Sequence, residues 1–514
     1  MQNKTYDAVI IGAGHNGLIT AIYLAKAGKK VLMLEKNDYI GGATTSQKVF
    51  PEFDASLSRY SYLVSLLPAN IIQELGLNLN LLKRKIASYT PYGTDKGLLI
   101  SNIDESISKA SILNLGYGEA EWLGYQTLLE KQTTFAELVW DSFLEPLKPK
   151  KAWLDSFKNQ AEHELWNAFV EQPIGHLIKQ YIKSDVLQGV FLTDAKIGSF
   201  TAAFDESLLQ NRTFIYHIIG NKTGEWRVPQ GGMGNIAAQL LEKALNLGVD
   251  IQTNAKVVDY ELMENRQTVQ FEMEGKTYDT QAEYLIWNAN PVRKENYQRT
   301  EEGTAFKINM LLKKLPKLKD KAVDAADAFA GTFHINQLAS DMEMTYNEAI
   351  AGEIPRQLAG EIYCHTLTDS SILSQDLEQK GYHTLTYFGL DLPYQLFLED
   401  NKAQKNIVLE RFYEGLNAYL EEPIQSCLAE DSKGNLCVEA KSSVDLEAEL
   451  GFPRGNIFQS ELSWFFAENE AEIGTMGVET NHPKQFICGS SAKRGGAVSG
   501  IPGRNAAMKI LGKI

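Results

Sequence analysis

The chain has 514 residues, of which 44% are hydrophobic and 22% are charged, and its formal net charge is −15 at pH 7. This length exceeds what one hydrophobic core normally accommodates, so we expect two lobes. Binding to nucleic acid or to anionic lipid depends on a clustered basic surface, and the acidic balance of this chain argues against both.

The N-terminal segment predicts a strand, a glycine turn, a helix and a second strand. Residues 6–11 (YDAVII) form a short apolar run that is typical of a parallel strand buried on both faces. Residues 18–27 place apolar side chains at helical spacing, and residues 30–34 (KVLML) form a second apolar run. The stretch from Ala8 to Gly28 is about as long as a membrane span, but a turn explains its glycines better, so we expect a soluble, cytoplasmic protein.

The turn between the first strand and the helix matches the dinucleotide-binding pattern G-x-G-x-x-G at residues 12–17. Gly12 permits the tight turn, Gly14 lets a pyrophosphate approach the backbone, and Gly17 lets the helix pack against the strand. Free N–H groups and the dipole at the start of the helix favour the two phosphates. Glu35, at the end of the second strand, can accept hydrogen bonds from a ribose hydroxyl. This context predicts a dinucleotide site.

A second glycine pair distinguishes between the possible dinucleotides. Gly41 and Gly42 follow the acidic strand within the segment IGGATT (residues 40–45). A plain NAD dehydrogenase does not require such a turn, whereas in many flavoproteins it lies along the pyrophosphate and the ribityl chain. We therefore expect FAD as the cofactor.

The rest of the chain alternates between helical, aromatic-rich segments and short strands. Residues 57–216 are mainly helical, for example at 120–142 and 154–180, and residues 299–448 are mixed. Strand and helix patterns of the dinucleotide-binding type return at residues 226–287 and 485–511. The sequence thus predicts three blocks of one lobe, separated by two insertions that form a substrate-side lobe.

Taken together, these motifs resemble the phytoene desaturase-like flavoproteins, a branch of the amine-oxidase-like FAD superfamily. The resemblance covers essentially the whole chain and rests on these segments: 6–18, 41–45, 53–67, 229–234, 306–309, 455–458 and 500–507. It implies an α/β fold with a Rossmann-like FAD-binding domain of the glutathione-reductase type and an inserted α+β substrate domain. The FAD-binding domain would comprise residues 1–70, 220–300 and 450–514, and the substrate domain residues 71–219 and 301–449.

The resemblance also implies a set of cofactor-binding residues but no catalytic residue. Glu35 and Val257 correspond to the adenosine end, and Ala289, in the segment from Asn288 to Pro291, to a chain passing beside the cofactor. For His15 we expect a structural role in the turn rather than phosphate contact. The implied set is Gly12, Gly14, His15, Asn16, Gly17, Glu35, Lys36, Gly42, Ala43, Thr44, Val257, Ala289, Gly489, Val498, Ser499 and Gly500.

One departure from the family pattern lies near the C-terminus. Relatives usually carry histidine and proline before a glycine pair, whereas this chain has Lys493 and Arg494 before Gly495 and Gly496. Two interpretations stay open. The cations could stabilise an anionic reduced flavin or hold an acidic substrate, or they could lie on a solvent-facing loop.

Two further patterns each have two interpretations. Residues 232–237 fit G-x-G-x-x-A, which suggests an NADPH site, but no clear apolar strand precedes them and Pro229 lies just before, so we expect a turn beside the flavin. Residues 311–319 combine leucines and lysines and could make a peripheral membrane contact. Pro316 interrupts any long amphipathic helix, so we expect a solvated strand-to-loop edge instead.

The four cysteines show no C-x-x-C pair, which disfavours a disulfide reductase, and the histidines show no metal-ligand spacing, so we expect no metal. The preferred function is an FAD-dependent oxidoreductase of the desaturase or dehydrogenase type. It would transfer a hydride between an apolar or amphipathic small molecule and flavin N5. The alternatives are a flavin amine oxidase and a redox-inert FAD-containing binding or assembly protein. The sequence does not indicate the oligomeric state.

Overall fold

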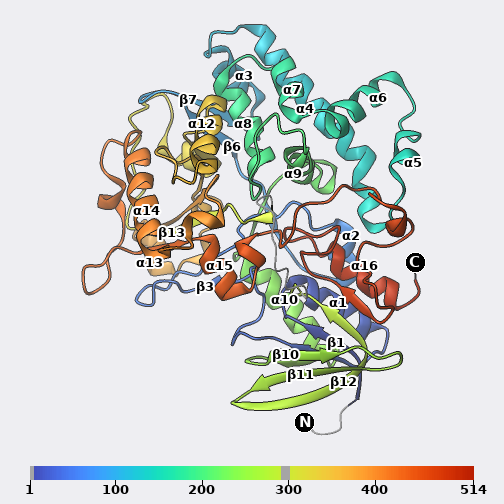
Figure 1. Cartoon of the computed structure of the whole chain (residues 1–514). Coiled ribbons are helices and arrows are strands. Elements are labelled where there is room, and N and C mark those ends of the chain that lie inside the picture. The colour runs from blue at the N-terminus through green and yellow to red at the C-terminus, as the bar shows by residue number, and fades with distance from the viewer. Residues whose placement is uncertain (1–4, 291–300, 514) are drawn as a thin grey trace.

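Two seven-stranded sheets organise the chain in the computed structural model (Figure 1). The structure describes residues 5–290 and 301–513, so Pro291 of the predicted cofactor-side segment lies outside the described residues. In the first sheet the strand order is β10-β11-β12-β1-β2-β9, and β18 also pairs with β12. Its strands are β1 (Thr5–Ile11), β2 (Val31–Leu34), β9 (Asp250–Gln252), β10 (Lys256–Glu261), β11 (Gln267–Met273), β12 (Lys276–Trp287) and β18 (Gln485–Ile487).

The second half of strand β1, residues 8–11, is apolar and buried because both of its faces are covered. It pairs in parallel with β2 and β12. Ala8 and Ile10 pack in a core with three helices, α1 (His15–Lys26), α10 (Met233–Asn246) and α16 (Ile501–Ile510). Val9 and Ile11 belong to another core that includes Phe271 of β11. Figure 1 shows β10, β11 and β12 below α1 and α10. A strand buried on both faces is what the continuous apolar run predicts.

The second sheet has the strand order β17-β13-β16-β15-β14-β6-β7, and all its neighbours are antiparallel except β14 and β6. Its strands are β6 (Ile86–Pro91), β7 (Gly97–Ser101), β13 (Phe306–Leu312), β14 (Thr332–Ile335), β15 (Gly360–Tyr363), β16 (His383–Gly389) and β17 (Val438–Lys441). One face of this sheet packs on a core that includes Phe333, Ile335 and Ile362. The short strands β3 (Ser46–Gln47), β4 (Leu57–Ser58), β5 (Leu81–Leu82) and β8 (Val228–Pro229) form two separate pairs.

The helices of residues 105–218 carry a cluster of large buried aromatic side chains. Phe135 and Phe169 stack with their ring centroids 4.5 Å apart, and Phe465, from near the C-terminus, meets the same cluster. Most aromatics of this segment therefore belong to a core, whereas Tyr216 also lines the cavity described below. The helices are α3 (Glu105–Leu113), α4 (Glu119–Val139), α5 (Lys150–Leu154), α6 (Gln160–Trp166), α7 (Ile174–Tyr181), α8 (Asp185–Lys196) and α9 (Leu209–Ile218).

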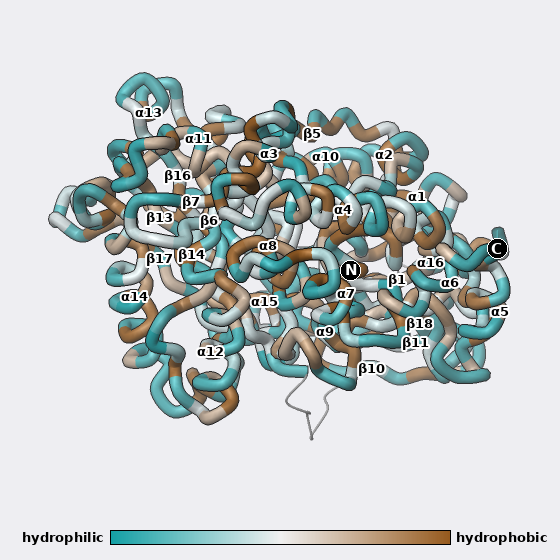
Figure 2. The backbone as a smooth tube through the Cα atoms, turned by 90° about the horizontal axis from the view of Figure 1, so that it is seen from above, coloured by the Kyte–Doolittle hydropathy of each residue, from teal (hydrophilic) through white to brown (hydrophobic). Residues whose placement is uncertain are grey.

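The remaining helices cover the outer sides of the molecule. In Figure 2 the hydrophilic segments gather on outer loops and on outer helices such as α14. Among the described residues, no helix combines the length and the apolar character needed to cross a membrane. These helices are α2 (Ala69–Leu75), α11 (Ala325–Ala330), α12 (Ala339–Ile350), α13 (Gln375–Gln379), α14 (Asn401–Asn417) and α15 (Ser443–Leu450).

The α/β fold with its N-terminal strand, turn, helix and strand is confirmed, whereas two helical expectations were wrong. The expected helical region of residues 57–216 begins with strands, because residues 57–101 include β4, β5, β6 and β7. Residues 154–180 do not form a continuous helix but are divided among α5, α6 and α7. Asn159 caps α6 by accepting a hydrogen bond from the backbone N–H of Glu162. Pro173 precedes α7, where its missing N–H cannot continue the helix before it.

The aromatic core predicts a large stability difference between two positions of α4. Phe135 is fully buried, whereas Leu123 is 59% exposed. Phe135→Ala leaves a cavity, and we expect it to lower the free energy of unfolding by about 3–5 kcal/mol. Leu123→Ala, on the same helix, should change it by about 0.5 kcal/mol or less. Urea unfolding measures both, and equal effects of the two substitutions would contradict this core.

Candidate functional site

The glycine turn between β1 and α1 has the tight geometry that the sequence predicts. Gly12 has a φ of +95°, a conformation that side chains other than glycine rarely adopt. A Cβ atom on Gly17 would lie 2.6 Å from the carbonyl oxygen of Gly12. Helix α1 can therefore begin directly behind the strand only because residue 17 is glycine.

The second glycine turn lies against the first. The N–H of Gly41 donates to the carbonyl oxygen of Ala13 at 2.9 Å, and a Cβ atom on Gly42 would lie 3.5 Å from the Cα atom of Gly14. Within the described part of the chain, no hydrogen bond occupies the N–H groups of Asn16 and Gly17 at the start of α1. Two turns without side chains at their glycines, with backbone N–H groups at a helix start that donate to no other described group, can hold a pyrophosphate.

Asn288, which the sequence reasoning did not select, locks the glycine turn in place. Its Nδ2 donates to the carbonyl oxygen of Gly12 at 3.1 Å, and the N–H of Ala289 donates to Ile11 at 3.0 Å. A Cβ atom on Gly489 would lie 2.4 Å from the carbonyl oxygen of Asn288. Ala289 and Gly489 thus both meet the turn at the carboxyl end of β12. The signal in the sequence that could have indicated this role of Asn288 is its position directly after a buried strand.

Glu35 and Val257 lie close together at the other end of the turn. The buried Glu35 carboxylate accepts from the N–H of Ala13 at 2.8 Å and from that of Asn37 at 2.9 Å. The carbonyl oxygen of Glu35 accepts from Ala255, two residues before Val257. Each carboxylate oxygen keeps a second lone pair with which it could accept a ribose hydroxyl. Lys36, beside it, is exposed to solvent.

The C-terminal residues of the set surround the start of α16. Ser499 is buried, and its Oγ accepts from the N–H of Ile501. Gly500 has a φ of +70°, and a Cβ atom there would lie 2.5 Å from Cδ1 of Ile19 on α1. Asn16 lies at the same contact between helices, because a Cβ atom on Gly503 would meet its carbonyl oxygen at 2.4 Å. The side chain of Asn16 thus does not line the cavity described next, although its N–H belongs to the turn.

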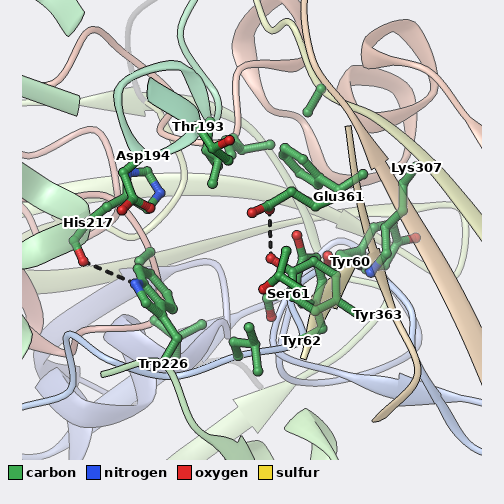
Figure 3. Close-up of a pocket in the computed structure, with 18 of the residues that line it drawn as sticks. Tyr60, Ser61, Tyr62, Thr193, Asp194, His217, Trp226, Lys307, Glu361 and Tyr363 are labelled. Atoms are coloured by element: carbon green, nitrogen blue, oxygen red, sulfur yellow. Dashed lines mark hydrogen bonds between the residues drawn. The ribbon is translucent and has the colours of Figure 1, made fainter. Parts of the chain in front are cut away.

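A cavity of about 330 Å³ joins the glycine turns to the second sheet (Figure 3). His15, Ala43, Thr44 and Val498 line one part of it. His15 Nδ1 lies 2.9 Å from Thr44 Oγ1, while its buried Nε2 has no partner among the described residues. Burial lowers the pKa of His15 to about 4, so the ring is neutral at pH 7. Apolar side chains form much of the remaining wall, among them Val190, Ile197, Trp226, Phe388, Ile457 and Phe458.

The second sheet turns a polar face toward this cavity. Along β14 and β15 the residues alternate, so that Thr332, His334, Glu361 and Tyr363 line the cavity while Phe333 and its apolar neighbours enter the core behind. Arg84 and Ser88 belong to the same polar wall, and all six are buried. The sequence analysis selected none of these residues.

Two carboxyl groups of the cavity have different environments. Glu361 Oε2 accepts from the Tyr363 hydroxyl at 2.6 Å, and His334 Nε2 lies 3.8 Å from Oε1. Asp194, on α8, lies with His217 on the side of the cavity opposite Glu361 (Figure 3). Burial, with a smaller contribution from the charge of Glu361, raises the pKa of Asp194 to about 8. At pH 7 Asp194 is therefore mostly protonated and can donate a hydrogen bond.

Lys307, on β13, also lines the cavity. Its Nζ donates to the backbone carbonyl oxygens of Ser58 at 2.9 Å and Tyr60 at 2.7 Å, and it lies 4.6 Å from the centre of the Tyr62 ring. Burial lowers the pKa of Lys307 well below its usual value. These contacts fix the amine in one orientation.

Comparison with known proteins places the chain in a family. An NAD(P)-binding Rossmann-like domain matches residues 10–70. An uncharacterised protein of Mycobacterium tuberculosis is 37% identical over 99% of this chain and 98% of its own. Pyridine nucleotide-disulfide oxidoreductase domain-containing protein 2 of Mus musculus is 26% identical over 98% of this chain and 93% of its own. The chain belongs to the family of these proteins.

The family and the fold agree. The structure of a putrescine oxidase variant aligns with 99% of this chain and over 99% of its own chain. The sequence identity is 16% and the TM-score is 0.58. The fold is therefore the Rossmann-like FAD-binding fold of amine-oxidase-like flavoenzymes. The chain is thus similar over its whole length to an oxidoreductase domain-containing protein and shares its fold with an amine oxidase.

Lys493 and Arg494 replace the histidine and proline of the family pattern. For Arg494 both interpretations, contact with flavin or substrate and a place on a solvent-facing loop, are wrong. This side chain is only 3% exposed and donates to the backbone carbonyl oxygens of Ser142, Glu145 and Phe465. Neither Lys493 nor Arg494 lines the cavity, and Lys493 forms ion pairs with two glutamates. Arg494 thus attaches the C-terminal segment to the end of the helical group, whereas Lys493 pairs within the C-terminal segment.

The G-x-G-x-x-A segment at residues 232–237 starts α10 and holds no free phosphate site. The N–H of Met233 donates to Ser58 Oγ at 3.1 Å, and that of Gly234 donates to Ser46 Oγ at 2.9 Å. Strand β8, before it, pairs only with β5 among the described strands. The expected turn and helix start therefore fit better than a second dinucleotide site.

The leucine- and lysine-rich segment at residues 311–319 begins inside β13. Leu311 and Leu312 are buried, while Lys313 and Lys314 form ion pairs with Glu430 and Glu422. This arrangement matches the expected solvated strand-to-loop edge, because Lys313 and Lys314 directly follow the end of β13. A peripheral membrane contact stays a prediction.

The environment of Asp194 predicts a pH-dependent stability difference. A folded-state pKa raised from 3.8 to about 8 contributes stability that is present below pH 4 and lost as pH rises to about 8. Asn does not titrate, so Asp194→Asn removes this dependence. The unfolding free energy of the variant minus that of the wild type should therefore increase as pH rises from about 4 to about 8, and stay constant above pH 8. Urea unfolding at several pH values measures the difference. With the exposed Asp95→Asn as control, a difference independent of pH would contradict this environment.

Proposed function

We propose that the chain is an FAD-dependent oxidoreductase of the desaturase or dehydrogenase type that acts on an apolar or amphipathic organic molecule. The observation that carries this proposal is the shared cavity, which residues of both glycine-turn regions and residues of the second sheet line together. A cofactor held on the turns and a substrate held by the sheet could meet there. When bound, FAD would supply a two-electron acceptor.

The residues around the turns fit FAD. Gly14 and Gly42 leave the approach to the backbone open, and the neighbouring N–H groups of Asn16 and Gly17 are unused by other described residues. His15 lines the same cavity beside them. We propose that these residues, with Glu35, Val257, Ala289, Gly489 and residues 498–500, hold the cofactor.

The division into two domains follows the same proposal. The described strands of the first sheet all come from residues 1–70, 220–300 and 450–514, which we propose as the FAD-binding domain. Those of the second sheet all come from residues 71–219 and 301–449, which we propose as the substrate domain. The chain's own contribution to the reaction is then to orient the substrate against the cofactor and to keep water out.

Amine oxidation is the second candidate, and Glu361 is the observation in its favour. A carboxylate in the cavity could accept hydrogen bonds from a substrate ammonium group. However, Glu361 Oε2 already accepts from Tyr363, and His334 lies beside Oε1. The lining of the cavity also includes many apolar side chains, and this favours the oxidation of a non-amine substrate.

Flavin content tests the cofactor assignment. The purified protein should show the two visible absorption bands of an oxidised flavin and release FAD on denaturation. Bleaching of the long-wavelength band by a substrate without oxygen would show that the flavin is redox-active. A colourless protein that does not take up added FAD would overturn the proposal, and a flavin inert to every substrate class would favour a binding role.

Gly14→Val tests the position of the cofactor. The valine side chain would occupy the approach to the turn. A Cβ atom added to Gly14 would itself lie only 3.0 Å from Asn288 Nδ2. We expect at least about a tenfold loss of bound FAD, measured as absorbance per protein. Ala27→Val adds the same side chain at the exposed C-terminal end of α1 and should retain full flavin content. Normal flavin content in Gly14→Val would refute the assignment.

A further inference from the structure

The polar wall of the cavity contains a guanidinium group without an ionic partner. Arg84 is 9% exposed and lines the cavity just before β6. Its Nη1 donates to Thr332 Oγ1 at 2.8 Å, while its Nε has no partner. Among the described residues, none forms an ion pair with Arg84, and no hydrogen bond occupies its Nη2. Within the described part of the chain, the Thr332 hydroxyl is thus the one polar group that the guanidinium contacts.

A buried positive charge with so few partners is costly unless a ligand completes its shell. Buried charges in proteins are normally paired, because transfer out of water costs several kcal/mol. A guanidinium is always charged and presents its donors as a planar fork that matches a carboxylate. Arg84 also lies 5.8 Å from the centre of the Tyr363 ring, which restricts its orientation. It is therefore preorganised to receive an anionic group.

The neighbouring carboxyl groups, Glu361 and Asp194, do not form an ion pair with Arg84, so a ligand can take that place. Glu361 accepts from the Tyr363 hydroxyl and has His334 beside its other oxygen. Asp194 is mostly protonated at pH 7, so it can donate a hydrogen bond to an anion rather than repel it. Ser88 and Thr332 add hydroxyl groups to the same wall. This end of the cavity therefore offers donors around Arg84.

The other lining residues suit an apolar chain. Val190, Ile197, Phe388, Ile457 and Phe458 all line the same cavity. A molecule with one anionic end and an aliphatic body would place its charge at Arg84 and its hydrocarbon along these side chains.

From this geometry we propose that the cavity binds an amphipathic carboxylic acid, whose carboxylate pairs with Arg84. This inference deepens the proposed function, on which it rests, by naming the substrate class. The carboxylate is a binding group and takes no part in the redox step. Arg84 is therefore a specificity-determining residue.

Three probes with the same ten-carbon chain test the head-group preference of the flavin-bound wild-type protein. These probes are decanoate, decanol and decylamine, and quenching of tryptophan fluorescence reports binding because Trp226 lines the cavity. We expect decanoate to bind at least about tenfold more tightly than decanol, with decylamine weakest. Equal binding of decanoate and decanol, a preference for decylamine, or no binding of decanoate would overturn the proposal.

Arg84→Gln tests the residue itself. We expect it to abolish the preference for decanoate over decanol while decanol binding stays within about twofold of wild type, because the apolar wall is unchanged. Arg356→Gln removes the same charge from an exposed side chain and should retain the preference. Retention of the preference in Arg84→Gln would overturn the assignment. If that variant fails to fold, the three probes on the wild type still decide the proposal.

This experiment separates the inference from the proposed function. A yellow protein that contains FAD but does not prefer decanoate would retain the proposed oxidoreductase function and lose the acidic substrate. A colourless protein that prefers decanoate would lose the flavin function and retain the acid site.

Discussion

The approach of helix α1 to the end of β1 is the constraint on which the site depends. Gly17 and the carbonyl oxygen of Gly12 are so close that a Cβ atom would lie 2.6 Å away. Because the helix starts there, its first N–H groups lie at the turn instead of further along the chain. Asn288 then holds the turn from β12, and the second glycine pair covers its other side. The cavity opens where these segments end.

The two sheets contribute to this cavity in different ways. The central strand of the first sheet is apolar on both faces and serves to place the turn. The second sheet has one apolar face in a core and one polar face in the cavity. Burying polar groups costs free energy unless they are hydrogen-bonded. A buried polar wall with an unpaired Arg84 therefore indicates a ligand, whereas an apolar wall would only indicate an enclosed space.

The sequence predicted the parts of the site that depend on local spacing. The glycines, Glu35 and the strand before them lie within thirty residues, and their geometry follows from backbone sterics and strand register. The polar wall could not be predicted, because an alternating strand such as β14 or β15 normally exposes its polar face to solvent. Thr332, His334 and Glu361 are buried because segments far away in the sequence, among them α8 and α9, enclose the same cavity. Arg494 was misjudged for the same reason, since its carbonyl partners at Ser142 and Glu145 lie about 350 residues away in sequence.

Electron density for the protein crystallised with FAD is the most direct measurement of whether one cavity serves both cofactor and substrate. The expected density places the pyrophosphate at the turn of residues 12–17, the adenosine end beside Glu35 and the flavin ring inside the cavity that His15 and Lys307 line. Density for the flavin ring outside this cavity, or for a nucleotide at the turn before α10, would contradict that arrangement.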